Sequence, residues 1–205
     1  MSARSFSITT LVLLVAACVT GFQEAREVER LVDVLDVDPG EVFADVGAGD
    51  GRFSLALAAR VGHDGLVYAT EVDRDDLREI RDRVARDQAN NITVIEGSQR
   101  STGLPDICCD GILLRRVYHH FQDPAAMRES LKRALKEDGL LLVIDFGEKR
   151  HWDRPSGIPE SRDGHGVSKK MLVSEMELAG FELVRDMDWS DGDYALLFRV
   201  AHLPD

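Results

Sequence analysis

The sequence predicts an α/β fold, a doubly wound sheet of seven strands that is mostly parallel and ends in an antiparallel hairpin. Short apolar runs rich in β-branched residues alternate with amphipathic helical patterns along most of the 205 residues. Strands of this kind are typical of a parallel sheet that helices cover on both faces. The last two apolar runs are separated only by a short turn, so they must be antiparallel.

The predicted elements follow one another in a regular order. Strands are expected at residues 41–46, 65–72, 91–97, 109–117, 140–147, 181–189 and 193–201. Helices are expected at residues 24–37, 51–61, 73–87, 123–139 and 168–180. Asp73 is suited to cap the third of these helices. Pro124 lies in the first turn of the fourth, and Gly139 stands just past its expected end.

Composition and charge narrow the classes of partner. The net charge of -12 argues against binding a bare phosphate backbone, which needs a basic face, so no nucleic acid is expected. A small molecule or another protein is favoured. Cys108 and Cys109 are adjacent at the start of a predicted strand, where buried thiols are expected rather than a disulfide scaffold. No cluster has zinc-ligand spacing, so no metal site is expected.

The first 22 residues form a leader that is separate from the predicted domain at residues 23–205. Its apolar centre, residues 11–19, is shorter than the ~20 residues of a membrane span and suits an export signal. The end of that centre, "VAAC", resembles a bacterial lipobox. Lipidation of Cys18 would then attach the protein to a membrane. An uncleaved anchor or a helix of the fold is the alternative.

A glycine-rich loop follows the first strand, with Gly47, Gly49 and Gly51 at alternate positions. Ligands bind at the carboxyl ends of the strands in such sheets, and glycine lets the backbone approach them closely. The dinucleotide fingerprint is G-x-G-x-x-G, whereas the spacing here is G-x-G-x-G. Asp45 and Asp50 place negative charge around the loop, which suits a cation better than a diphosphate.

The region from Glu41 to Val200 resembles the class I (Rossmann-like) S-adenosylmethionine-dependent methyltransferases. The stretch "DVGAGDG" matches the first motif of that family, D/E-x-G-x-G-x-G, at all four defining positions, and the terminal hairpin is also typical. The resemblance implies methyltransferase activity with S-adenosyl-L-methionine as cofactor. It also implies a set of cofactor-binding residues: Asp45, Gly47, Ala48, Gly49, Gly51, Glu71, Val72, Ser98, Gln99 and Arg115.

By this resemblance, Asp45 holds the ammonium side of the methionine, directly or through water, and the glycine loop passes under the methionine and ribose. Glu71, twenty residues after Gly51, accepts hydrogen bonds from both ribose hydroxyls, and Val72 lies against the adenine. The sequence departs from the family after the third strand. Ser98 stands where the family often has an acid, so Ser98 or Gln99 would make a weaker, neutral hydrogen bond.

Candidate catalytic residues follow the fourth strand in "LLRRVYHHFQDP", namely Tyr118, His119 and His120. Similar "HH…DP" stretches occur in small-molecule members of the family, including quinone-biosynthesis methyltransferases. The alternative is that these side chains serve packing, because methyl transfer mainly needs alignment and exclusion of water. The long connection at residues 145–170 would line or lid the acceptor pocket with Trp152, Arg162 and His165, or else form a solvated loop.

The predicted function is therefore methyl transfer to an acceptor, small molecule or protein, that the sequence does not name. Two alternatives stay open: a non-catalytic lipoprotein that kept the fold, and an NAD(P)-dependent oxidoreductase. The leader suggests export or membrane anchoring, whereas the supply of S-adenosylmethionine suggests the cytoplasm. The sequence leaves the oligomeric state undetermined.

Overall fold

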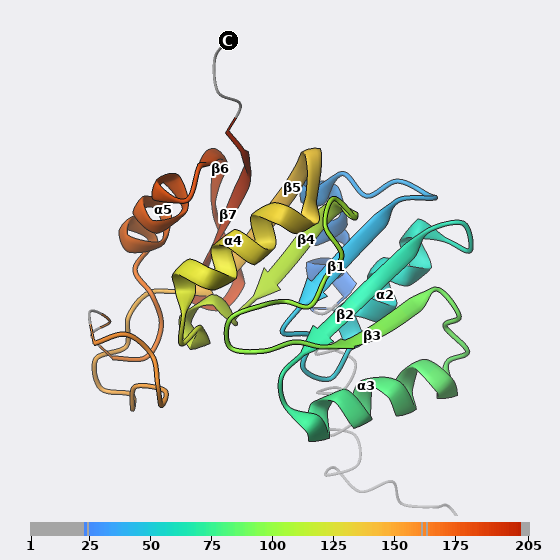
Figure 1. The fold of residues 1–205 in the computed structure, drawn as a ribbon, viewed down its shortest axis with the longest axis horizontal. Helices are drawn as coiled ribbons and strands as arrows, with labels where there is room; N and C mark the ends of the chain where they lie inside the picture. Colours follow the sequence, from blue (N-terminus) through green and yellow to red (C-terminus); the bar gives the residue numbers. More distant parts are fainter. Residues whose placement is uncertain (1–22, 24, 161, 163, 202–205) are drawn as a thin grey trace, which may run out of the picture.

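The sheet has seven strands in the order β3-β2-β1-β4-β5-β7-β6 (Figure 1). The computed structural model describes residues 23, 25–160, 162 and 164–201. Within them β7 runs antiparallel to both of its neighbours, β5 and β6, while β1 to β5 pair in parallel. The predicted fold class is thus confirmed. The strands are β1 (Val42–Val46), β2 (Leu66–Glu71), β3 (Ile92–Glu96), β4 (Cys109–Arg115), β5 (Leu135–Phe146), β6 (Phe181–Asp188) and β7 (Asp193–Val200).

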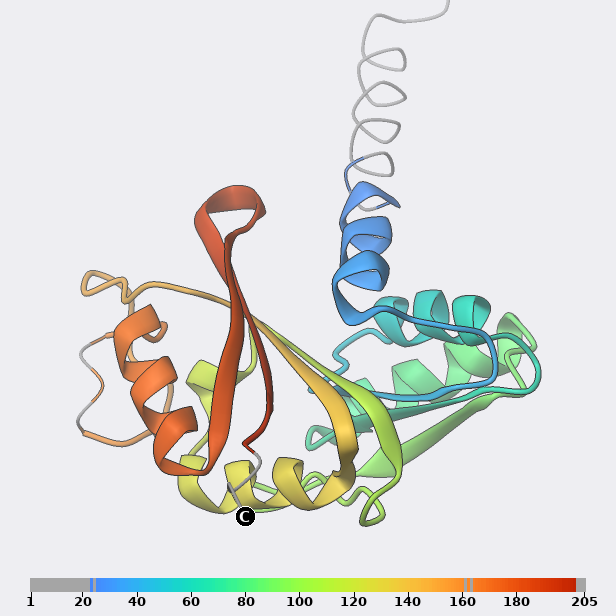
Figure 2. The same ribbon diagram turned by 90° about the horizontal axis from the view of Figure 1, so that it is seen from above.

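Helices cover both faces of the sheet, as Figure 2 shows from above. One core joins the helix over residues 25–35 with α2 and α3 through Leu31, Leu57 and Ile80. The other core joins α4 and α5 through Leu131 and Met176. After the helix over residues 25–35 come α2 (Arg52–Val61), α3 (Arg74–Arg86), α4 (Pro124–Ala134) and α5 (Lys169–Leu178), with short 3₁₀ turns at η1 (Tyr118–His120) and η2 (Ser190–Gly192).

The helix starts follow the capping residues in the sequence. The carboxylate of Asp73 accepts the backbone N–H groups of Asp75 and Asp76 at the start of α3, as predicted. Asp123 caps α4 in the same way, with Pro124 in the first turn. These caps place the loops after β2 and β4 at the carboxyl edge of the sheet.

The predicted end of α4 is wrong. The helix stops at Ala134 rather than near Gly139, and residues 135–138 are the extended start of β5. The backbone N–H groups of Ile107 and Cys108 donate to the carbonyls of Arg133 and Ala134, which satisfies the end of the helix. Leu135 is 4% exposed against the sheet, so burial overrides the helical preference of this segment.

Two further predictions from the sequence concern the adjacent cysteines and the N-terminal leader. Cys108 and Cys109 are joined to each other by a disulfide at the amino end of β4, which corrects the expectation of two free thiols. The predicted leader, with Cys18, lies outside the described residues, so the lipoprotein signal stays a prediction. Over the described part of the chain, no helix combines the length and apolar character that a membrane span requires.

Candidate functional site

A cavity of about 460 Å³ opens at the carboxyl ends of β1, β2 and β4. Six residues predicted from the sequence lie in its wall, and the wall also includes Thr70, Asp76, Arg116, Val117, Phe121 and Met127. The six are Gly47, Glu71, Val72, Ser98, Gln99 and His120. The size is that of a small-molecule site, and the position is the one at which open α/β sheets bind ligands.

The glycine loop is fixed to the neighbouring strand and needs its glycines. The backbone N–H groups of Gly47 and Ala48 both donate to the carbonyl of Thr70 on β2. Gly47, Gly49 and Gly51 have φ angles of 73°, 53° and 76°, in the left-handed region that side chains rarely adopt. A Cβ at Gly47 would lie 2.4 Å from Cγ2 of Val117, so the loop also packs directly against the segment after β4.

Glu71 ends β2 in the cavity wall and is oriented by backbone N–H groups. Its Oε2 accepts the N–H of Gly49 at 3.1 Å, and its Oε1 accepts the N–H of Val72 at 2.6 Å. An ionised carboxylate offers about four acceptor positions, so these bonds leave capacity for ligand hydroxyls. The Gly49 contact joins the glycine loop and the acid into one preformed unit.

Asp45 lies beneath the loop rather than in the cavity wall. It is 2% exposed, and its Oδ2 accepts the hydroxyl of Ser54 on α2 at 2.7 Å. Burial raises the pKa of Asp45 to about 6; the Ser54 hydrogen bond opposes this shift, and the charge of Glu71 adds to it. Burial and the charges of Glu71 and Asp73 also raise the pKa of Asp76 in the cavity wall. This end of the cavity therefore favours a positively charged ligand.

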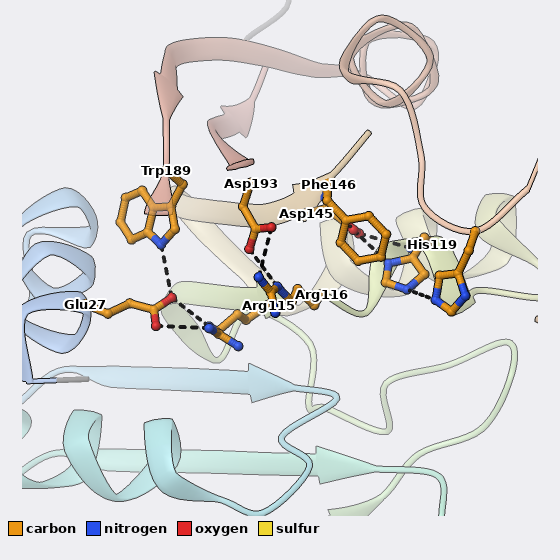
Figure 3. A network of polar contacts seen from close by, with 9 residues as sticks. Glu27, Arg115, Arg116, His119, Asp145, Phe146, Trp189 and Asp193 are labelled. Carbon is orange, nitrogen blue, oxygen red and sulfur yellow. Dashed lines mark hydrogen bonds and ion pairs between the residues drawn. The ribbon is translucent and has the colours of Figure 1, made fainter. Parts of the chain in front are cut away.

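The two adjacent arginines at the end of β4 lie in different surroundings (Figure 3). Arg115 makes a two-bond ion pair with Glu27 on the helix of residues 25–35, at 2.8 and 3.0 Å. Its neighbour Arg116 lies in the cavity wall and makes a similar pair with Asp193 at the start of β7, at 2.7 and 3.1 Å. Arg116 lies one residue past the end of β4 and has a φ of 54°, so the backbone turns there and the cavity takes the arginine next to the predicted Arg115.

The three candidate catalytic residues are not equivalent. Tyr118 is fully buried and its hydroxyl donates to Glu175 at 2.6 Å; burial and the charge of Glu175 raise its pKa, so it stays protonated. His119 is 1% exposed behind the cavity wall. His120 lies in the wall, and partial burial beside His119 and His165 lowers its pKa to about 4, so its imidazole is neutral near pH 7. Of these three residues, only His120 lies where it would contact a ligand in the cavity.

Asp145 at the end of β5 holds His119 in place. The sequence did not predict this pair. Its Nδ1 lies 2.7 Å from Oδ1 of Asp145, and the other oxygen of Asp145 accepts its backbone N–H at 3.2 Å (Figure 3). Asp145 is completely buried and also accepts the N–H of Phe146. From its place at the end of a strand, Asp145 is a candidate for orienting the acceptor, whereas the structure pairs it with His119, and a separation of 26 residues gives no local signal of that pair.

The connection from β5 to α5 partly covers the cavity. Pro155 and Ser156 from this segment lie in the cavity wall. Arg162, expected to face the acceptor, is instead 1% exposed, and it donates to the carbonyl of Tyr118 and to Glu175. Trp152 is 49% exposed and packs edge-on against Phe146. The segment is therefore anchored by a buried arginine and is not a solvated loop throughout.

Comparison with known proteins gives a consistent picture. Residues 44–143 match a family model described as a methyltransferase domain. Over 122 residues, 57% of this chain, the sequence is 32% identical to the ubiquinone/menaquinone biosynthesis C-methyltransferase UbiE of Methylococcus capsulatus. It is 27% identical over 125 residues, 60% of the chain, to the uncharacterized methyltransferase YcgJ of Bacillus subtilis. In both cases the match covers 48% of the relative, so the chain spans about half the length of the curated relatives it matches.

Solved structures share the fold at lower sequence identity. A SAM-dependent methyltransferase from Aquifex aeolicus superposes with a TM-score of 0.71 at 23% identity, covering 83% of this chain and 88% of that one. The [4+2]-cyclase SpnF reaches the same TM-score at 16% identity, covering 86% and 81%. The chain thus has the class I methyltransferase fold, and the matched segment and the relatives support a methyltransferase.

Proposed function

We propose that the protein is an S-adenosyl-L-methionine-dependent methyltransferase acting on a small-molecule acceptor. The observation that carries the proposal is the unit formed by the glycine loop and Glu71 in the cavity wall. The Gly49 N–H orients the carboxylate, which lines the cavity and retains acceptor capacity for ligand hydroxyls. A dinucleotide would bring a diphosphate to an acidic loop, whereas S-adenosylmethionine brings a sulfonium and an ammonium.

The residues present fit this cofactor. Glu71 would accept the ribose hydroxyls, Val72 would lie beside the adenine, and Ser98 and Gln99 would face the adenine edge from the same wall. Ala48, Gly49 and Gly51 would supply backbone under the ligand, while buried Asp45 would act through the charge it places below the loop. Arg115, paired with Glu27, would stabilise the wall from behind rather than touch the cofactor.

When bound, the cofactor supplies a methyl group on a positively charged sulfur, which is already a good leaving group. The chain has to align an acceptor and exclude water. Val117, Phe121 and Met127 give part of the cavity an apolar wall suited to a small, partly apolar acceptor. His120 is the one predicted catalytic residue in that wall, and Tyr118 and His119 would support its position from the interior.

Both alternatives to this function are disfavoured. The relatives are named as methyltransferases, and the third glycine comes one position too early for a dinucleotide. The presence of a cyclase among the structures of the same fold means that turnover needs its own test.

Calorimetry of the full-length chain with S-adenosylmethionine, S-adenosylhomocysteine and NAD⁺ tests the proposal. We expect binding of the first two and none of NAD⁺. Glu71→Ala should weaken binding by about 1–3 kcal/mol through lost hydrogen bonds to a charged group. Glu96→Ala is the matched control, because Glu96 is the register partner of Glu71 at the end of β3. Equal affinities in the two variants would reject the ribose assignment.

Binding and turnover are then separated by a second measurement. Wild-type protein is incubated with methyl-labelled S-adenosylmethionine and a panel of small phenols, quinols and amines, and formation of S-adenosylhomocysteine is followed. We expect acceptor-dependent product. Tight binding with no product from any acceptor class would favour the non-catalytic alternative.

A further inference from the structure

Three imidazoles converge beside the cavity, and none of the functions described above explains why. His119 and His120 come from η1, and His165 comes from the connection between β5 and α5. One ring nitrogen from each lies within 4.8 Å of the others. His165 is 46 residues from His119 in the sequence, so the fold brings it to the adjacent pair His119 and His120. We call this group the histidine cluster.

In two of these rings, the Nδ1 nitrogen already has a hydrogen-bond partner. Nδ1 of His119 lies 2.7 Å from the Asp145 carboxylate, which can only accept, so this nitrogen carries the proton. Nδ1 of His165 lies 3.1 Å from the carbonyl oxygen of Asp153, which again requires a donor. These partners assign the same tautomer to both rings, with a lone pair on each Nε2.

The two lone pairs face each other. Nε2 of His119 and Nε2 of His165 are 3.1 Å apart, and His119 is 1% exposed. Two neutral acceptors at this distance repel, so the contact requires a cation between them. A proton satisfies two nitrogens. A metal ion binds three or four, and a ring nitrogen of the third imidazole, His120, lies within 4.8 Å of both.

The separation of the two Nε2 atoms and the supporting contacts match a metal site. Bonds of about 2.0–2.1 Å in a tetrahedron put two ligand nitrogens about 3.3 Å apart. The Asp145–His119 pair is the carboxylate–histidine arrangement that orients metal ligands and raises their basicity. Asp145 is itself fixed by the N–H groups of His119 and Phe146. A proton shared by His119 and His165 would not require a third imidazole nearby.

We propose that His119, His120 and His165 bind one divalent transition metal ion of the zinc class. Neutral imidazoles suit this class, whereas calcium and magnesium prefer oxygen ligands. Three protein ligands leave a fourth position for water or for an atom of the acceptor. The ion would join η1 to the connection that carries Pro155 and Ser156, and so fasten this part of the cavity wall. The proposal does not depend on methyl transfer.

The test uses the full-length chain, purified without a polyhistidine tag, stripped with chelator and titrated with zinc ion by calorimetry. We expect one zinc per chain for the wild type. His165→Ala and His120→Ala should each lower the affinity at least 100-fold. His63→Ala and His151→Ala are the controls, since His63 lies in an exposed turn after α2 and His151 is a histidine of the same connection outside the cluster. Both should leave the affinity unchanged.

A second readout detects the geometry of the site. Cobalt(II) added to the stripped protein should give the visible absorption of a tetrahedral centre, lost in His165→Ala. Asp145→Asn should lower zinc affinity about 10–100-fold while all three ligands remain. Circular dichroism checks that each variant is folded. The proposal is overturned if the wild type binds zinc no more tightly than His165→Ala, or if His151→Ala removes binding. Imidazole NMR signals that titrate with pH but do not respond to zinc would overturn it in favour of a shared proton.

Discussion

The two halves of the carboxyl edge of the sheet are built in different ways. At the ends of β1 and β2, the glycine loop and Glu71 are separated by about twenty residues and joined by backbone N–H groups. At the ends of β4 and β5, the histidine cluster and Asp145 come from segments 26 and 46 residues apart and are joined by side chains. The first half is specified by local backbone conformation, and the second by long-range packing.

The two halves should therefore be sensitive to different kinds of substitution. A unit made from backbone depends on the absence of side chains, so added volume should damage it most. A unit made from side chains depends on paired donors and acceptors, so loss of a partner should damage it most. The following changes test this division, in order of expected effect.

Gly47→Ala should have the largest effect, about 4 kcal/mol of unfolding free energy. The new Cβ would meet Val117 at 2.4 Å, and alanine is strained at a φ of 73°. Gly40→Ala is the control, because Gly40 has a φ of 89° but nothing within 4 Å of a Cβ. Urea unfolding of both variants measures the difference. Similar losses in the two would show that Val117 does not press on the loop.

Asp45→Asn should change how stability depends on pH. Asp45 holds its proton more tightly in the folded chain, with a pKa of about 6 against 3.8, so raising the pH through this window removes about 3 kcal/mol of stability. The variant keeps an acceptor for Ser54 but has no charge. Its unfolding free energy relative to wild type should therefore rise by this amount between about pH 3 and about pH 7. If the difference in unfolding free energy between variant and wild type did not change with pH, the pKa of Asp45 would be the same in the folded and unfolded chain.

Asp145→Asn should cost about 2 kcal/mol in the metal-free protein. An amide group would turn an N–H toward the N–H groups of His119 or Phe146, leaving a buried donor unpaired. Asp64→Asn, at an exposed position, is the control and should have little effect. Thermal unfolding of the two variants in the presence of chelator measures this. No loss would show that the second half does not depend on its paired groups.

Glu27→Gln should have the smallest effect, about 1 kcal/mol, and it probes a paired side-chain contact outside both halves, between the helix over residues 25–35 and Arg115. Burial alone would raise the pKa of Glu27, but hydrogen bonds from Arg115 and Trp189 outweigh it, and the pKa is lowered. The stability that this carboxylate contributes is present above its ordinary pKa of 4.5 and is lost as the pH falls. Unfolding at pH 7 should separate variant and wild type, and the two should converge at lower pH.

The fold could be predicted from sequence because its signals are local. The strand runs and helix caps such as Asp73 each act within a few residues, and the G-x-G-x-G spacing marks where the backbone must bend. The end of α4 could not be predicted in this way. It is decided by burial of Leu135 and by the N–H groups of Ile107 and Cys108, which come from another part of the chain.

The residues of the candidate site also divide into those that a local sequence signal marks and those that it does not. Gly47, Glu71 and Val72, which the resemblance to class I methyltransferases implied as cofactor-binding residues, lie in the cavity wall. Arg116 was missed because it lies one residue past β4 with a φ of 54°, where the alternation of a strand no longer applies and no local pattern marks the turn. The convergence of His165 on His119 leaves no trace in local sequence, since it follows from how the connection after β5 folds back onto η1.

The most direct test of the account is a crystal structure of the protein with S-adenosylhomocysteine bound. The account predicts the ribose hydroxyls within hydrogen-bonding distance of the Glu71 carboxylate, with the glycine loop beneath the amino-acid portion. An empty cavity at saturating ligand, or a ribose held elsewhere than at Glu71, would contradict it.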